Sequence, residues 1–191
     1  HFVRFDELHK HMVVDPAFTA SGDGARSAII IVGTDMATGK HLVLEAAAQR
    51  LEPRDLVLDI LAKMSTWSVT RLFVESVAQQ KGFIQFIESE ARSKGQGIIL
   101  EEVKPGGRAK DLRIEALQVY FKSGQLLVHQ MQLDLLDEYR KSRPGAKYKD
   151  LLDALAYSPE CWPRVNRGAS GSAKQRSQHQ VAEYLRRRRL A

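Results

Sequence analysis

The sequence has 191 residues, of which 43% are hydrophobic and 27% are charged, a composition that excludes a disordered or fibrous chain and is typical of one folded domain. No apolar run reaches the roughly 18 residues that a membrane-spanning helix needs, and the single cysteine, Cys161, cannot form an internal disulfide. The net charge of +6 suggests a nucleic-acid partner, but eight basic residues and one acidic residue lie within 164–191. Residues 1–163 hold 21 basic and 22 acidic residues, so a contact between this part and nucleic acid requires a local basic patch.

The C-terminal segment differs in composition from the rest of the chain. Residues 168–180 are rich in Gly, Ser, Ala and Gln, which predicts a flexible linker, and residues 181–190 include four consecutive arginines. We therefore divide the chain into a folded domain at 1–163 and a linker with a basic tail at 164–191. The tail is interpreted as a nucleic-acid arm, a partner-docking peptide or a solvated end.

Three strands are predicted in the first quarter of the chain. Residues 12–15 form a short apolar run that Pro16 stops, residues 27–33 form a β-branched run, and residues 41–46 form a third apolar run. Short links between them indicate an antiparallel arrangement. The turn at 34–39 contains part of a phosphate-loop pattern, but it joins two predicted strands and opens no helix, so we interpret it as a simple turn.

Helices and strands alternate from Pro53 onward. Apolar residues at helical spacing and β-branched runs predict a helix from Pro53, a strand at 70–75, a helix at 79–93, a strand at 97–103, a helix at 110–122, a strand at 126–128, and helices at 133–141 and 148–157. This order predicts an α/β fold, with a mixed β-sheet and helices on its faces.

Acidic residues lie at the ends of two predicted strands and on the last predicted helix. Asp15 ends the first strand and Glu75 ends the fourth, and the carboxyl ends of strands line the usual site in α/β sheets. If these two strands are neighbours, the two carboxylates lie side by side. Asp150 and Asp153 lie one turn apart on one face of the last helix.

This set of carboxylates has no companion cysteines and no histidine pair at ligand spacing, which favours Mg²⁺ or Mn²⁺ over zinc. Two such ions typically catalyse phosphodiester hydrolysis. Each acid also has an ordinary structural interpretation, since Asp15 precedes a proline, Glu75 can be solvated at its strand end, and Asp150 can complement a helix dipole. The residues alone leave both interpretations open.

Four short motifs occur in the order and spacing that one viral family shows. They are Val14-Asp15-Pro16-Ala17, the Gly/Asp turn that leads into Ser27–Gly33, Phe73-Val74-Glu75-Ser76, and Lys149–Ala156. Over residues 11–160 the chain resembles the nuclease domain of the large terminase subunit of tailed bacteriophages. The resemblance implies an RNase H-like mixed sheet, with the first three strands antiparallel and later strands parallel. It also implies a DNA endonuclease that cuts concatemeric viral DNA during genome packaging with two Mg²⁺ or Mn²⁺ ions.

The resemblance implies roles for individual acids. Asp15 is similar to the acid of the first strand, Glu75 to the acid of the fourth strand and Asp150 to the acid of the last helix, which makes these three the implied catalytic metal ligands. Many relatives have two adjacent acids before that helix, whereas this chain has Lys149 at the first of the two positions. Asp153 is a further candidate metal ligand, with a structural role in the helix as the alternative.

A basic segment after the fifth predicted strand is the candidate DNA contact. Residues 104–114 resemble the basic segment of the same family. A glycine-rich turn before a helix would bring Arg108, Lys110 and Arg113 close to a DNA phosphate. The alternative is a solvated basic loop.

The implied partners are double-stranded DNA and, in the full-length protein, an N-terminal packaging ATPase domain, the small terminase subunit and the portal. The implied location is the cytoplasm of the infected bacterial host, with no membrane contact. Two other functions remain open: a junction resolvase or RNase of the same fold, and a non-catalytic module that binds nucleic acid or a partner.

Overall fold

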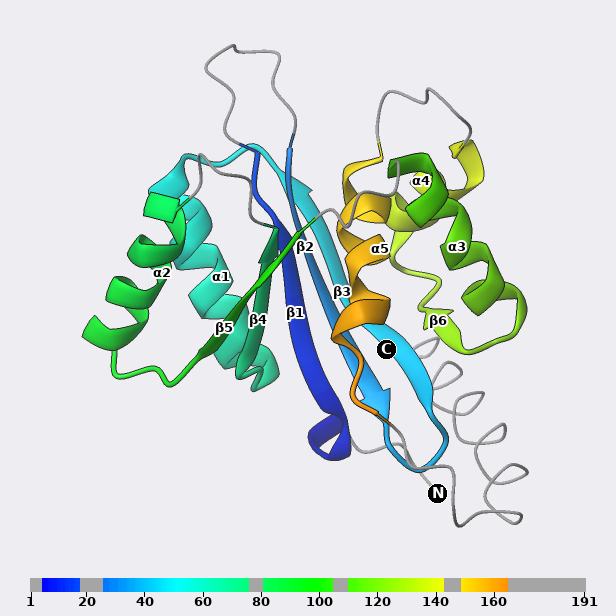
Figure 1. Ribbon diagram of the computed structural model, residues 1–191, viewed down its shortest axis with the longest axis horizontal. Helices are drawn as coiled ribbons and strands as arrows, with labels where there is room; N and C mark the ends of the chain where they lie inside the picture. Colours follow the sequence, from blue (N-terminus) through cyan, green and yellow to red (C-terminus); the bar gives the residue numbers. More distant parts are fainter. Residues whose placement is uncertain (1–4, 18–25, 76–80, 105–109, 143–148, 165–191) are drawn as a thin grey trace.

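A computed structural model describes residues 5–17, 26–75, 81–104, 110–142 and 149–164 (Figure 1). The predicted basic tail lies outside these residues. Within the described ranges no helix is both long enough and apolar enough to cross a membrane.

Within the described residues, six strands form one sheet in the order β5-β4-β1-β2-β3-β6. The strands are β1 (His9–Asp15), β2 (Ser27–Asp35), β3 (Lys40–Gln49), β4 (Arg71–Glu75), β5 (Ile99–Val103) and β6 (Leu126–Val128). The pairs β1–β2 and β2–β3 are antiparallel, whereas β1–β4, β4–β5 and β3–β6 are parallel. The predicted mixed sheet, with antiparallel first strands and parallel later ones, is confirmed.

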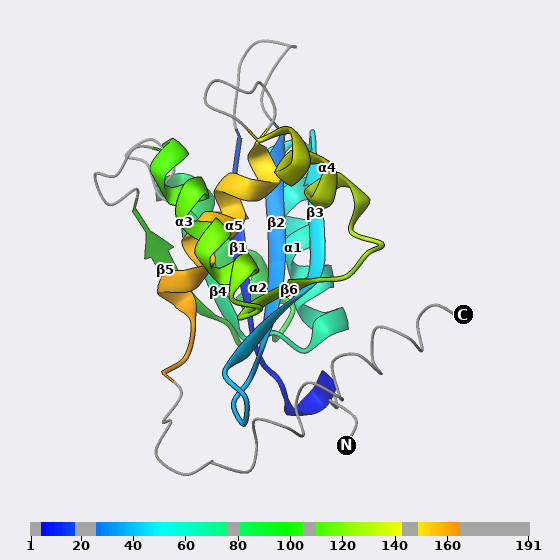
Figure 2. The same cartoon turned by 90° about the vertical axis from the view of Figure 1, so that its right-hand side faces the viewer.

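Helices cover both faces of this sheet. A short 3-10 helix (Phe5–Glu7) precedes β1, and the longer helices are α1 (Pro53–Trp67), α2 (Lys81–Ser93), α3 (Lys110–Lys122), α4 (Leu133–Lys141) and α5 (Asp150–Cys161). Figure 1 shows α1 and α2 on one face and α3, α4 and α5 on the other, and Figure 2 gives the view turned by 90°. Among the last three helices, α5 lies directly against the sheet, where it contacts β1, β2 and β3.

The alternation of side chains along β2 explains its unbroken apolar sequence. Ile29 and Ile31 point into the core under α1 and α2, whereas Ala28, Ile30 and Val32 point into the core under α5. Because successive side chains of a strand point to opposite faces, a strand covered on both faces must be apolar at every position.

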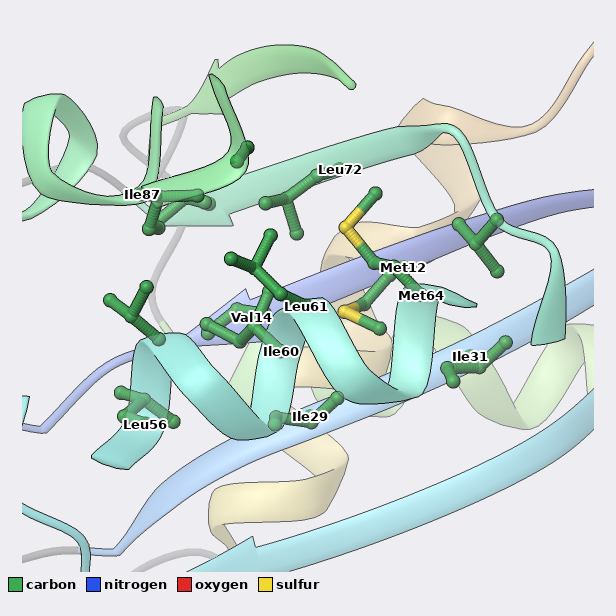
Figure 3. Packing of buried hydrophobic residues seen from close by; sticks show 14 of the residues in the cluster. Met12, Val14, Ile29, Ile31, Leu56, Ile60, Leu61, Met64, Leu72 and Ile87 are labelled. Atoms are coloured by element: carbon green, nitrogen blue, oxygen red, sulfur yellow. The ribbon is translucent and has the colours of Figure 1, made fainter. Parts of the chain in front are cut away.

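In the core under α1, the apolar side chains of the helix pack against the apolar side chains of the strands. Pro53 begins α1 at a position where its missing N–H costs no hydrogen bond, and the helix then presents one apolar stripe to the sheet. Figure 3 shows the packing of Leu56, Ile60, Leu61 and Met64 of α1 on Met12, Val14, Ile29, Ile31, Leu72 and Ile87. The four residues of α1 follow the helical spacing that predicts a helix from Pro53.

Element boundaries differ from the predictions where tertiary pairing overrides local preference. β3 continues past the predicted end at Ala46 to Gln49, because its alanines pair with the start of β2. α5 begins at Asp150 and ends at Cys161, four residues beyond the predicted end. The predicted start at Tyr148 lies outside the described residues.

Candidate metal centre

Two neighbouring parallel strands in the interior of the sheet bring two acids together at their carboxyl ends. β1 and β4 are neighbours with Val14 opposite Val74, so Asp15 and Glu75 follow at the same level. Both acidic residues are partly buried. The first and fourth strands are therefore neighbours, which was the condition for these two carboxylates to lie side by side at the carboxyl ends of the strands.

The third acid of the group comes from α5. Asp153 is buried, and ligand oxygens of Asp15, Glu75 and Asp153 all lie within 4.8 Å of one another. We call these three carboxylates the acid cluster. Asp153, Tyr157 and Cys161 are spaced four residues apart, so they lie along one stripe of α5, and the last two pack against side chains of β1, β4 and β5. The stripe therefore directs Asp153 toward the strand ends.

Asp150 lies outside the acid cluster in the described structure, and this differs from the role that the resemblance implied. Nε of Arg26 donates to Oδ2 of Asp150 at 3.0 Å, and Nη2 of the same arginine donates to Oε1 of Glu138 at 2.9 Å. Arg26 precedes β2 and Glu138 belongs to α4, so this network ties the first turn of α5 to two other elements. We call these three residues the Arg26 network.

Glu138 also caps α5 across a tertiary contact. Its Oε2 accepts hydrogen bonds from the backbone N–H groups of Leu151 at 2.9 Å and Leu152 at 3.2 Å. Backbone donors in the first turn of a helix have no partner within the helix, and a carboxylate there also complements the helix dipole. Burial raises the pKa of Glu138, while the two N–H groups and Arg26 counter part of that rise.

The acid cluster has its own hydrogen-bond donors. The hydroxyl of Tyr157 donates to Oε1 of Glu75 at 2.5 Å, and Nη2 of Arg113 donates to Oδ1 of Asp153 at 3.1 Å. Burial raises the pKa of Tyr157 far above its ordinary value, and the bond to the Glu75 carboxylate adds to the rise. The hydroxyl therefore keeps its proton across the physiological pH range.

The predicted DNA contacts are only partly described. Arg108 and the side chain of Lys110 lie outside the described residues. The side chain of Arg113 is 9% exposed and is paired with Asp153, so its position favours orienting that carboxylate over the expected role as an open phosphate contact.

Lys149 also has an internal partner. Its side chain is 5% exposed, and its Nζ lies 2.5 Å from Oδ1 of Asp111 in α3. The ammonium thus links the start of α5 to α3 and provides no carboxylate for a second ion.

Comparison with solved structures identifies the fold. No family model matches the sequence, and no curated protein matches it significantly. The terminase nuclease domain of human cytomegalovirus matches with a TM-score of 0.61 and 18% identity, over 85% of this chain and 88% of that one. A Mn-soaked, inhibitor-bound structure of that domain gives a TM-score of 0.53 with 17% identity, over 82% and 84%. The nuclease domain of the P22 large terminase gives 0.61 with 14% identity, over 84% and 85%. This chain has the RNase H-like fold of terminase nuclease domains.

The RNase H-like fold is shared with a second kind of viral protein. The fowlpox virus resolvase, in complex with Holliday junction DNA, matches with a TM-score of 0.52 and 11% identity, over 79% of this chain and 97% of that one. In the present chain the acid cluster lies at the carboxyl ends of β1 and β4 of this fold, with α5 supplying the third acid.

The donor set of the acid cluster fits a hard divalent cation. Among the described residues the group contains three carboxylates and neither histidine nor cysteine. Carboxylate oxygens suit Mg²⁺ and Mn²⁺, whereas structural zinc sites use mainly thiolate and imidazole ligands. Two unit charges 4.8 Å apart repel by about 3.5 kcal/mol at an effective dielectric constant of about 20, so a cation offsets a real cost.

Sequence reasoning missed three polar residues around these acids. Tyr157 lies four residues after Asp153 in an apolar helix, and this spacing was the one local signal for a shared face. Arg26 and Glu138 had no local signal. The partners of Arg26 lie 112 and 124 residues away, and the nearest partner of Glu138 lies 13 residues away.

Proposed function

We propose that this chain is a divalent-metal-dependent DNA endonuclease, with Asp15, Glu75 and Asp153 as the metal ligands. The observation that carries the proposal is the convergence of these carboxylates within 4.8 Å at the strand ends of an RNase H-like sheet. Asp150 is not included, because its carboxylate is paired with Arg26 and lies outside the acid cluster.

The chemistry follows from the residues that hold the ions. Bound Mg²⁺ or Mn²⁺ ions supply Lewis acids for phosphodiester hydrolysis, with two ions as the arrangement that the resemblance implies. Asp15 and Glu75 approach from the sheet and Asp153 approaches from α5, so that ligands come from two layers of the fold. Rigid elements on both sides favour the precise placement that catalysis requires.

The biological reaction that we propose is the cutting of concatemeric viral DNA during genome packaging. The order of the four sequence motifs and the likeness of the fold to the cytomegalovirus and P22 terminase nuclease domains support it. Its partners would be double-stranded DNA, a packaging ATPase domain of the same protein, the small terminase subunit and the portal.

The test is cleavage of supercoiled plasmid by the whole chain with Mn²⁺, with Mg²⁺ and with chelator. Asp15→Asn, Glu75→Gln and Asp153→Asn are expected to lose metal-dependent cleavage while they keep their circular dichroism spectra. Asp137→Asn is the matched control, because Asp137 is an exposed acid of α4 that pairs with Lys141. An inert wild type that also binds no divalent ion would refute the proposal and favour a non-catalytic binding module.

A second candidate function is resolution of branched DNA. The likeness to the fowlpox virus resolvase, which covers 97% of that chain, specifically favours it. Cleavage rates on a four-way junction and on a linear duplex of the same sequence separate the two functions. A packaging nuclease cuts the plain duplex at least as fast as the junction, whereas a resolvase prefers the junction.

A further inference from the structure

Tyr157 lies next to the acid cluster and is held by packing on every side. It is 1% exposed, and its ring belongs to a buried cluster with Val13 of β1, Phe73 of β4 and Val103 of β5. A ring fixed in this way has few positions for its hydroxyl, and that hydroxyl donates to Oε1 of Glu75. The hydrogen bond therefore ties Glu75 to the rigid centre of the fold.

Arg113 makes a similar contact with Asp153, the acid that α5 supplies. Its guanidinium donates to Oδ1 of Asp153 at 3.1 Å. The central carbon of the same guanidinium lies 4.6 Å from the centre of the Tyr157 ring, which is within the range of a cation–π contact. Tyr157 and Arg113 therefore contact each other as well as one acid each.

These contacts answer a physical difficulty of the site. Three carboxylates within 4.8 Å repel one another before a cation arrives, and their side chains would separate unless other groups held them. A hydroxyl donor and a guanidinium each use one carboxylate oxygen and leave further lone pairs available to a metal ion. Loss of a group that hydrogen-bonds a metal ligand commonly lowers metal affinity by 10–100-fold.

We propose that Tyr157 and Arg113 are linked positioning residues that hold Glu75 and Asp153 at metal-binding distance. The inference rests on the proposed function, since it requires that the acid cluster binds a divalent cation. It assigns Arg113 to the support of the metal ligands and not to DNA. It also gives the buried tyrosine of α5 a role that apolar packing alone does not require, because phenylalanine would fill the same space.

The first test compares two tyrosine variants of the whole chain. Tyr157→Phe removes the hydroxyl that donates to Glu75. Tyr139→Phe is the control, because it makes the same chemical change on α4, where the ring packs on Phe121. Mn²⁺ binding is measured from the loss of the free Mn²⁺ signal in electron paramagnetic resonance. Tyr157→Phe is expected to raise the Kd by about tenfold or more. Tyr139→Phe is expected to match the wild type.

The second test uses Arg113→Lys, which keeps the positive charge and removes the planar guanidinium. Because the charge near the ion is unchanged, a rise in Kd reports lost positioning and not altered repulsion. We expect a rise of about tenfold. The double variant is expected to bind more tightly than the product of the two single effects predicts, since the two side chains contact each other.

Several outcomes separate this inference from the proposed function. If the wild type binds Mn²⁺, Asp153→Asn does not, and both positioning variants bind like the wild type, the inference is wrong while the proposed function stands. If the wild type binds no Mn²⁺, both fail. Excess Mn²⁺ should restore cleavage in Tyr157→Phe, because the defect lies in affinity. Cleavage that stays lost at saturating Mn²⁺ would overturn the positioning role.

Discussion

Two aspartates of α5, three residues apart, lie among different polar partners. In the Arg26 network one guanidinium bonds both Asp150 and Glu138, and Glu138 also accepts two backbone N–H groups. In the acid cluster three carboxylates converge within 4.8 Å, and the guanidinium of Arg113 donates to Asp153. In the first region Asp150 is paired with a guanidinium, whereas in the second Asp153 belongs to a group of three carboxylates that could hold a metal ion. The groups that surround an acid at the start of a helix therefore indicate its role, whereas its spacing in the sequence does not.

The largest expected effect is a difference in cleavage rate between variants of the two aspartates. Asp153→Asn is expected to lower Mn²⁺-dependent plasmid cleavage by about 1000-fold, beyond the 10–100-fold that is typical of losing a group that hydrogen-bonds a metal ligand. Asp150→Asn keeps an oxygen that Arg26 can bind, and it is expected to change the rate by less than about tenfold. The reverse pattern of rates would show that Asp150 is the metal ligand of α5.

The same two variants should differ in how metal affects their stability. Mn²⁺ at about 100 times its Kd stabilises a protein that binds it only when folded by about 2.7 kcal/mol. Urea unfolding with Mn²⁺ and with chelator is expected to show this gain for the wild type and for Asp150→Asn. Asp153→Asn should show almost none, and a full gain in that variant would remove Asp153 from the ligand set.

Loss of the tertiary cap tests the structural role of the Arg26 network. Glu138→Ala removes the acceptor of two N–H groups of α5 and one partner of Arg26, so the free energy of unfolding is expected to fall by about 2 kcal/mol. Asp137→Ala, on the same helix but exposed and paired with Lys141, should cost less than about 0.5 kcal/mol. Equal losses in denaturant unfolding of the two variants would argue against the cap.

A pH-dependent effect concerns the contact between His11 and Ser158 near the end of α5. His11 contacts Ser158 at 2.8 Å, and burial, followed by the charges of His41 and Arg71, lowers the pKa of His11 from 6.5 to about 3. The unfolded chain therefore takes up a proton below pH 6.5 that the folded chain does not. Stability is complete above that pH and falls by up to about 1.4 kcal/mol per pH unit as the pH drops from 6.5 toward 3.

His11→Gln removes this titration and should make the fall in stability between pH 6.5 and 5 shallower. His9→Gln, at the exposed start of β1, is the matched control and should keep the wild-type slope. Stability measured by urea unfolding at pH 7, 6 and 5 decides the matter, and identical slopes for all three proteins would contradict the assignment to His11. The same experiment sets the pH range in which the metal assays compare folded proteins.

Much of the fold follows from local patterns in the sequence. The β-branched run of β2 predicts a strand covered on both faces, and the apolar spacing after Pro53 predicts α1. The placement of Asp15 and Glu75 at strand ends was also readable, because a strand end is a local feature. Their meeting then required only that the first and fourth strands be neighbours, and the sheet order shows that they are.

Local sequence could not decide which acid of α5 joins Asp15 and Glu75. Both Asp150 and Asp153 lie in the first turn of the helix, and their spacing is compatible with either choice. The choice depends on Arg26, which is 124 residues from Asp150 in the chain, and on Tyr157, which reaches Glu75 across 82 residues.

The sequence by itself therefore determined the order of the elements and the two acids at the strand ends, since both depend on residues close together in the chain. Only the tertiary structure decided the third acid of the cluster, the cap of α5 and the partner of Arg113. The physical reason is that charge balance and hydrogen bonding act through space, so they depend on which distant side chains the fold brings together.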